Sequence, residues 1–237
     1  MKNATRKSSL GRLLAAGALV SGAIFAANGA MACTVDNWSS NFGGGLAAGD
    51  PVADGIARYQ GLCGLEVTGT GYVQDDSPGG IDRIVARFYV LNDNTEPATI
   101  YRGFSATDGT GELFNITLDD AGLVTLTDTN TGQSVSDTGG TNWLSVEIDW
   151  VRDATGSISL TVNGQPEQST NIDNSGSALL ASVRLGNLEG AAGTVGFDSY
   201  ESRRSTAVGR LLRADANNDG AITSGDITVS VNEIFDD

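Results

Sequence analysis

Residues 144–150 alternate strictly between apolar and polar side chains. Leu144, Val146, Ile148 and Trp150 share one parity, and serine, glutamate and aspartate fill the positions between them. A period of two is that of an extended strand, so this stretch predicts a β-strand with one buried face. Such a strand must pair with others and cover its apolar face, which limits the chain to folds built on sheets.

The same logic finds strands along most of the chain. Residues 158–162 alternate again and end in Asn163-Gly164, a dipeptide typical of tight turns, and residues 153–156 are short enough for a hairpin loop. Further strands are predicted at 65–73, 83–91, 99–104, 114–118, 124–126, 182–188 and 194–200. Roughly ten strands with almost no helical periodicity predict an all-β antiparallel sandwich over residues 33–204.

The first 32 residues have the layout of a secretory signal peptide. Four basic residues precede an apolar run at 13–27, and Ala30-Met31-Ala32 follows it. No later stretch approaches the roughly 20 apolar residues of a membrane-spanning helix. We therefore expect a soluble, secreted protein with no membrane span.

The mature chain is strongly acidic. It would keep 10 basic and 29 acidic residues, a net charge of −19, with no lysine and no histidine. Such a surface repels nucleic acid and anionic lipid and favours cations. Without histidine, any catalysis would depend on carboxylates, tyrosines or a bound cation.

Two cysteines, Cys33 and Cys63, remain after the signal peptide. In an exported chain this pair predicts one disulfide that closes a loop of about 30 residues. A lipoprotein anchor at Cys33 is the alternative, because Cys33 would be the first mature residue. The sequence before it lacks the leucine typical of lipidation sites, which favours the disulfide.

Several strands together resemble a known fold family. RIVARFYVL, WLSVEIDWVRDATGSISLTVNG, VRLGNLEG and GTVGFDSYESRR are similar to successive strands of bacterial laminin-G-like, concanavalin A-like domains. The resemblance implies an antiparallel jelly-roll β-sandwich. It implies little about function, since this fold hosts lectins, hydrolases, lyases and adhesive modules alike.

Glu147-Ile148-Asp149 resembles the start of the E-I-D-x-E signature of laminarinase-type glucanases. A retaining glycosidase needs two carboxyl groups about 5 Å apart. The positions where the second acid belongs hold Val151 and Arg152. The catalytic pair is incomplete, so no catalytic residue is predicted, and Glu147 and Asp149 remain candidates for ligand binding on the polar face of the strand.

Aromatic side chains and acidic loops offer further candidate sites. Trp143 has the parity of Glu147 and Asp149, so it is predicted to face outward and to stack on a sugar ring, whereas Trp150 is predicted in the core. Residues 74–77 and Asp119-Asp120 are acidic enough to hold a cation, but their position in turns favours solvated loops.

Residues 215–226, DANNDGAITSGD, have the order of a calcium-binding loop of the EF-hand type. Oxygen side chains stand at positions 1, 3, 5, 9 and 12, a glycine permits the turn at position 6, and position 7 supplies a carbonyl. The predicted Ca²⁺ ligands are Asp215, Asn217, Asp219, Ala221, Thr223 and Asp226. Ile227, Val231 and Ile234 then predict a short amphipathic helix.

This loop and helix resemble one repeat of a dockerin, so residues 205–237 are predicted to form a dockerin-like calcium tail. The resemblance implies a cohesin-like partner. Dockerins carry two repeats, however, and this chain carries one, with Ser224-Gly225 at the usual partner-contact positions. A structural calcium clip therefore competes with docking.

Three functions follow from these features. The first is a secreted, non-catalytic, calcium-binding module that binds a polysaccharide or cell-surface glycan through the sandwich. The second is a polysaccharide-degrading hydrolase or lyase of the same fold. The third is a structural component docked through the calcium repeat.

Overall fold

A computed structural model describes residues 34–92, 96–190, 193–211 and Ser224. The predicted signal peptide, Cys33 and all six predicted calcium ligands lie outside the described residues. The described part contains no helix that is long and apolar enough to cross a membrane.

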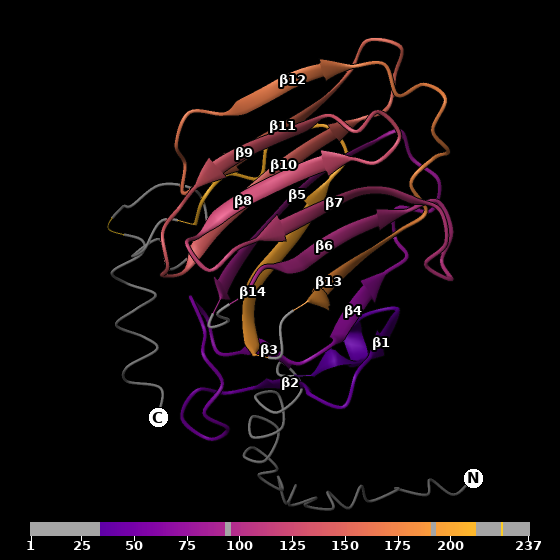
Figure 1. Ribbon diagram of the computed structural model, residues 1–237. Coiled ribbons are helices and arrows are strands. Elements are labelled where there is room, and N and C mark those ends of the chain that lie inside the picture. The colour runs from indigo at the N-terminus through magenta and orange to yellow at the C-terminus, as the bar shows by residue number, and fades with distance from the viewer. Residues whose placement is uncertain (1–33, 93–95, 191–192, 212–223, 225–237) are drawn as a thin grey trace, which may run out of the picture. The chain divides into compact units, whose positions relative to one another are not determined.

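Two antiparallel sheets of seven strands each make up the fold, after a short 3-10 turn η1 (Val35–Asn37). Sheet A has the strand order β1 (Ser40–Phe42), β4 (Gly71–Asp75), β13 (Ser182–Gly190), β6 (Ala98–Phe104), β7 (Glu112–Leu118), β8 (Leu123–Asp128) and β9 (Ser134–Thr138). Sheet B has the order β12 (Gln168–Ile172), β11 (Gly156–Val162), β10 (Leu144–Val151), β5 (Arg83–Asn92), β14 (Thr194–Arg203), β3 (Gly64–Thr68) and β2 (Leu46–Gly49). Figure 1 shows the sheets stacked, with β7 and β8 in front of β5. The predicted antiparallel β-sandwich is confirmed.

The core lies between the sheets and is filled by the apolar parity of the strands. Trp150 is fully buried, as its alternation with Ile148 predicts, and its ring lies 5.5 Å from that of Phe114 in the opposite sheet. Phe88 of β5 packs in the same way on Tyr101 of β6, with ring centroids 5.3 Å apart. These pairs join the two sheets across the core.

The turn predicted at Asn163-Gly164 is confirmed. Both residues have positive φ, 54° and 67°, and the Gln165 N–H donates to the Val162 carbonyl at 3.0 Å. Two left-handed central residues define a type I′ turn, which asparagine and glycine adopt with little strain.

The prediction of one strand over residues 65–73 is wrong. Gly69, with φ 66°, ends β3, and β4 begins at Gly71 in the opposite sheet. Val67 and Val73 are nevertheless both fully buried, because each points inward from its own sheet. Val67 and Val73 are an even number of residues apart, which is the spacing of one face of a single strand, and this spacing led to the prediction of one strand.

Candidate functional site

Loops cover the outer face of sheet B, so several of its side chains are buried where those of an outer sheet face are usually in contact with solvent. On β5, the side chains opposite the core face include Val85, Arg87 and Tyr89, and these are only 2%, 3% and 1% exposed. Residues 56–63 and residues 205–211 supply contacts to this face, as described below. The second of these segments is called the strap.

Arg87 lies at the centre of this face, between two glutamates. Strand register places Glu147 of β10 opposite Arg87 on one side and Glu201 of β14 opposite it on the other. The Arg87 Nη2 atom lies 3.1 Å from Oε2 of Glu201. Arg87 Nε and Nη1 have no hydrogen-bond partner among the described residues, although both are buried.

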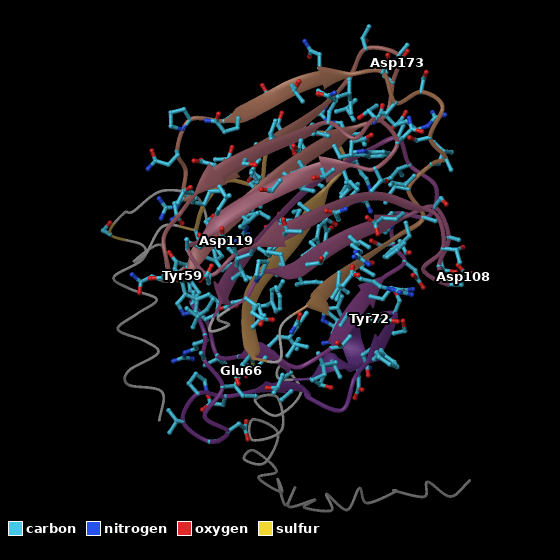
Figure 2. The ribbon with its side chains drawn as sticks, viewed as in Figure 1. Tyr59, Glu66, Tyr72, Asp108, Asp119 and Asp173 are labelled. Atoms are coloured by element: carbon cyan, nitrogen blue, oxygen red, sulfur yellow. The ribbon has the colours of Figure 1, made fainter. Side chains whose placement is uncertain are left out.

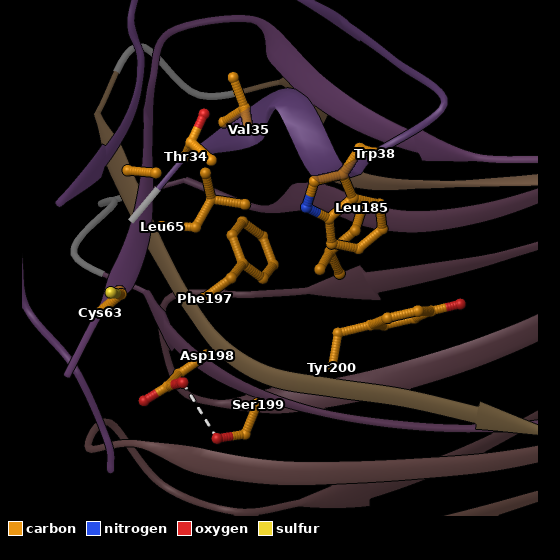
Figure 3. A pocket seen from close by; sticks show the side chains of 12 residues that line it. Thr34, Val35, Trp38, Cys63, Leu65, Leu185, Phe197, Asp198, Ser199 and Tyr200 are labelled. Carbon is orange, nitrogen blue, oxygen red and sulfur yellow. Dashed lines mark hydrogen bonds between the residues drawn. The ribbon is translucent and has the colours of Figure 1, made fainter. Parts of the chain in front are cut away.

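A bulge in β14 shapes the site beside Arg87. Asp198 pairs with Tyr89 and Glu201 with Arg87, so β14 has one residue more than β5 in this interval. Ser199 takes up the extra length with φ 51°, an uncommon value for a residue other than glycine. Figure 3 shows the result: Tyr200 points to the side of Trp38 and Leu185, and Asp198 and Ser199 point away from it.

Asp198 holds the covering loop in place. Its Oδ2 accepts hydrogen bonds from the backbone N–H groups of Tyr59 at 2.6 Å and Gln60 at 2.8 Å, and its Oδ1 accepts one from the Ser199 hydroxyl at 3.0 Å. These bonds place the Tyr59 ring on Tyr89, with centroids 3.7 Å apart and an angle of 15° between the rings. The loop is therefore anchored by the bulge itself.

Three aromatic rings gather at this end of sheet B. Trp143, the predicted stacking residue, is half-buried and meets Tyr59 edge to face, with centroids 6.2 Å apart. Figure 2 shows Tyr59 at the side of the sandwich away from Asp108 and Tyr72. Burial raises the pKa of Tyr89, which therefore remains a neutral hydrogen-bond donor at physiological pH.

The strap crosses the same face of the sheet. The Gly209 N–H donates to Oε2 of Glu147 at 2.5 Å, and the Leu211 N–H donates to the Tyr89 hydroxyl at 2.8 Å. Arg210 Nη1 donates to the Asn163 carbonyl at 2.8 Å. The chain that leads to the predicted calcium loop is thus attached to the sandwich.

The loop, the bulge and the strap enclose an open pocket of about 540 Å³. This volume lies within the usual range for small-molecule sites. The lining residues are Gln60, Gly61, Leu62, Cys63, Arg87, Asp198, Ser199, Tyr200, Glu201 and Leu211. Gln60 Oε1, like the two Arg87 nitrogens, is buried without a partner among the described residues, so three unsatisfied polar atoms belong to residues of one pocket.

A second, smaller pocket of about 140 Å³ lies on the other side of the bulge (Figure 3). Its walls are mostly apolar and include Val35, Trp38, Leu65, Leu185 and Phe197. This volume is below that of typical ligand sites. We therefore regard the Arg87 pocket as the candidate site.

The predicted ligand residues on β10 have different surroundings. Glu147 lies in the Arg87 row but already accepts the Gly209 N–H. Asp149 accepts two hydrogen bonds from Arg83, from Nε at 3.0 Å and from Nη2 at 2.6 Å. Asp149 is therefore engaged in an ion pair, and only Trp143 and Glu147 lie with the aromatic and charged groups described above.

In each acidic loop considered as a cation site, one aspartate accepts hydrogen bonds from its own loop. Asp75 accepts from the Ser77 N–H and hydroxyl at 2.8 and 2.9 Å, and Asp119 (Figure 2) accepts from the N–H groups of Ala121 and Leu123. The described part of the chain has no group of three or more acidic or cysteine side chains placed to hold a metal ion.

Cys63 lies directly before β3, and the described residues include no free cysteine. Because Cys33 lies outside the described residues, its pairing with Cys63 stays a prediction.

The residues that form the pocket were not predicted from the sequence. Arg87 did carry a signal, since it is the charged residue inside IVARFYVL, residues 84–91, where its neighbours on both faces of the strand are aliphatic or aromatic. Charged residues are almost never fully buried unless paired, so Arg87 implied a partner. Nothing in the sequence identified that partner as Glu201, 114 positions away.

Comparisons with known proteins support the fold. No family model matches the chain, and no curated protein matches its sequence. Among solved structures, the chain is similar to the cellulose induced protein Cip1, with 12% identity over 75% of this chain and 92% of Cip1, and a TM-score of 0.51.

Weaker similarities are found to two other structures. The receptor-binding domain of botulinum neurotoxin type G has 12% identity over 68% of this chain and 44% of that domain, with a TM-score of 0.45. The alginate lyase AlyC3 in complex with dimannuronate has 9% identity over 61% of this chain and 75% of the lyase, with a TM-score of 0.42. At these identities only the β-sandwich fold can be carried over, and Cip1 is the similarity that supports it.

Proposed function

We propose that the protein is an exported, non-catalytic module that binds a glycan in the Arg87 pocket. One observation supports this most strongly: Arg87 and Gln60 line an open pocket beside an aromatic cluster and together carry three buried polar atoms that have no partner among the residues the structure describes. Leaving such atoms unpaired costs about 1–3 kcal/mol each, and a ligand that pairs them recovers this energy.

Sugar binding requires polar groups for the hydroxyls and aromatic rings for the apolar face of the sugar. The pocket lining supplies the polar groups, and the rings of Tyr59 and Trp143, which lie outside the lining on the same face of sheet B, would stack on a part of the glycan that extends beyond the pocket. Cip1, which shares the fold, is described as a cellulose induced protein, in keeping with a polysaccharide ligand.

Secretion and calcium binding complete the proposal and depend on the sequence. Residues 1–32 would direct export, and Asp215, Asn217, Asp219 and Asp226 would supply carboxylate and amide oxygens to Ca²⁺. Docking to a cohesin-like partner remains the third hypothesis. Capture of no protein from the native secretome in calcium would count against it.

A glycan array with the mature protein, in calcium and in chelator, tests the proposal. We expect binding to at least one polysaccharide class, and we expect Tyr59→Ala or Trp143→Ala to weaken it at least tenfold. Phe42→Ala is the matched control, because Phe42 is an exposed aromatic on sheet A. Failure to bind any glycan would overturn the proposal.

A glycan-cleaving enzyme is the second candidate, favoured by the row of Glu147, Arg87 and Glu201. Three adjacent strands place the α-carbons of the two glutamates roughly 10 Å apart, which side chains can shorten to the spacing of an acid and base pair. Glu147 already accepts the Gly209 N–H, however, and Glu201 is paired with both Arg87 and Arg203. These contacts oppose a general-acid role and place the enzyme second.

Turnover assays on a broad polysaccharide panel separate the two candidates. A non-catalytic module releases no product with any variant. Product release that disappears in Glu147→Gln or Glu201→Gln, with glycan binding retained, would establish the enzyme and overturn the module.

A further inference from the structure

We infer that the Arg87 pocket selects a neutral, polyhydroxylated sugar unit and discriminates against uronates and sulfated sugars. The inference rests on the proposed function and deepens it, because it names the class of glycan. Three independent features of the pocket carry it: the unpaired donors and acceptor, the position of Glu201 on the guanidinium, and the charge of the lining.

The unpaired atoms match hydroxyl groups. Arg87 Nε and Nη1 can only donate hydrogen bonds, and Gln60 Oε1 can only accept them. A hydroxyl both accepts and donates, so hydroxyl groups of a sugar can pair with either kind of atom. A carboxylate or sulfate only accepts, so in an acidic sugar only the remaining hydroxyls could donate to Gln60 Oε1.

The covering loop holds Gln60 for this role. Its backbone N–H donates to Oδ2 of Asp198 at 2.8 Å, and Asp198 is in turn held by the β14 bulge. The backbone of Gln60 is therefore positioned by sheet B, the same sheet that carries Arg87. The donors and the residue that carries the acceptor are thus attached to one scaffold before any ligand enters.

Glu201 occupies the nitrogen that an acidic ligand would need. A carboxylate binds a guanidinium best across two adjacent nitrogens, either Nε with Nη2 or Nη1 with Nη2. Nη2 belongs to both arrangements and already lies 3.1 Å from Oε2 of Glu201. A second carboxylate in either position would share Nη2 and would lie a few ångströms from the first, where like charges repel.

The charge of the lining acts in the same direction. Among the described residues that line the pocket, Arg87 is the one positive side chain, and Asp198 and Glu201 are both negative. Arg203, which does not line the pocket, offsets part of the negative charge of Glu201, because its Nη2 lies 2.7 Å from Oε1 of Glu201. At longer range the whole chain, with a formal charge of −15, repels acidic polysaccharides.

Matched neutral and acidic glycans test the inference. The array carries β-glucans, mannans and galactans beside glucuronan, polymannuronate, polygalacturonate and sulfated galactans. Calorimetry then compares an oligosaccharide of the best ligand with its counterpart that differs at C6, where one has a hydroxymethyl group and the other a carboxylate. We expect the neutral form to bind at least tenfold more tightly.

Two variants assign this preference to the pocket. Arg87→Met should weaken binding of the neutral oligosaccharide at least tenfold. Glu201→Gln keeps the shape of the side chain and removes one negative charge. The ratio of the affinity for the neutral oligosaccharide to the affinity for its acidic counterpart should therefore fall at least threefold. Glu96→Gln, in an exposed loop, is the charge-matched control and should change neither value.

The outcomes separate this inference from the proposed function. Tighter binding of acidic glycans that is lost in Arg87→Met would overturn the inference and leave the glycan-binding module intact. The inference would also be overturned if Arg87→Met left the affinity for the neutral oligosaccharide unchanged, or if Glu201→Gln left the ratio of neutral to acidic affinities unchanged. Either result would place recognition outside the Arg87 pocket. No binding to any glycan would overturn the proposed function itself, and the inference with it.

Discussion

Asp128 shows how one polar residue can be accommodated in the core. Its side chain is fully buried at the end of β8, and each of its oxygens accepts two hydrogen bonds. Oδ2 accepts from Trp150 Nε1 at 2.9 Å and Asn174 Nδ2 at 3.1 Å, and Oδ1 accepts from the N–H and hydroxyl of Thr131. The indole of the largest core residue is therefore satisfied by a single carboxylate.

We expect Asp128→Asn to lower the free energy of unfolding by about 3 kcal/mol. The new amide turns an NH₂ group toward two existing donors, so buried hydrogen bonds to a charged acceptor are lost and donors are left unpaired. Urea unfolding should show a lower midpoint with an unchanged slope. Asp120→Asn, in an exposed turn, is the control, and an equal midpoint for both variants would contradict the expectation.

At the scale of elements, the strap is held by few bonds. Tyr89 and Glu147 accept the two backbone N–H groups described above, and both acceptors belong to sheet B. A segment with so few buried contacts opens more easily than the strands beneath it. The strap therefore combines a fixed position with low local stability.

Tyr89→Phe and Glu147→Ala should each release the strap while the sandwich stays folded. We expect the amides of residues 205–211 to exchange hydrogen about tenfold faster, and the global free energy of unfolding to change by less than about 1.5 kcal/mol. Hydrogen exchange read by mass spectrometry measures both. Asp149→Asn is the matched control, because Asp149 lies on the same strand and pairs with Arg83. Equal exchange in all three variants would show that these bonds do not hold the strap.

At the scale of the whole molecule, the buried Tyr101 and the half-buried Tyr200 couple stability to alkaline pH. Burial raises the pKa of Tyr200 to about 12 and that of Tyr101 well above its ordinary value, and their hydroxyls lie 3.2 Å apart. The pKa of an unfolded tyrosine is about 10. Between the two values the folded state retains protons that the unfolded state loses, so stability decreases as pH rises.

We therefore expect the contribution of Tyr200 to be complete below about pH 10 and to be lost between about pH 10 and 12. The loss from Tyr200 alone is on the order of 3 kcal/mol. Urea unfolding at pH 9, 10, 11 and 12 measures the slope, and tyrosinate absorbance reports the titration. Tyr200→Phe should reduce the slope, and a constant free energy over this range would contradict the expectation.

Calcium should act on the molecule through residues 215–226. We expect a dissociation constant on the order of 10⁻⁴ M, because the shorter Asp226 closes the loop in place of glutamate. Asp219→Ala should abolish binding in calorimetry, and Glu96→Gln should not. Equal calcium binding by Asp219→Ala would refute the loop as the site.

The strands that the sequence could not predict are all at the edges of the sheets. β1 and β9 flank sheet A, and β12 and β2 flank sheet B. An edge strand buries few side chains, as the alternation of exposed and half-buried positions in β9 shows, so its apolar period is weak. The central strands β5, β10 and β11 bury a full apolar face, which is why their patterns were visible.

Local patterns thus determined the strand character of the chain, the turn at Asn163-Gly164, the burial of Trp150 and the outward parity of Trp143, because periodicity and turn chemistry act within a few residues. The tertiary structure alone decided the candidate site. Arg87, Glu201 and Gln60 come from three distant segments, and an extra residue in β14 and a loop pinned by Asp198 bring them together. Their chemistry depends on which buried atoms remain unpaired, and this follows from the packing of the whole sheet face.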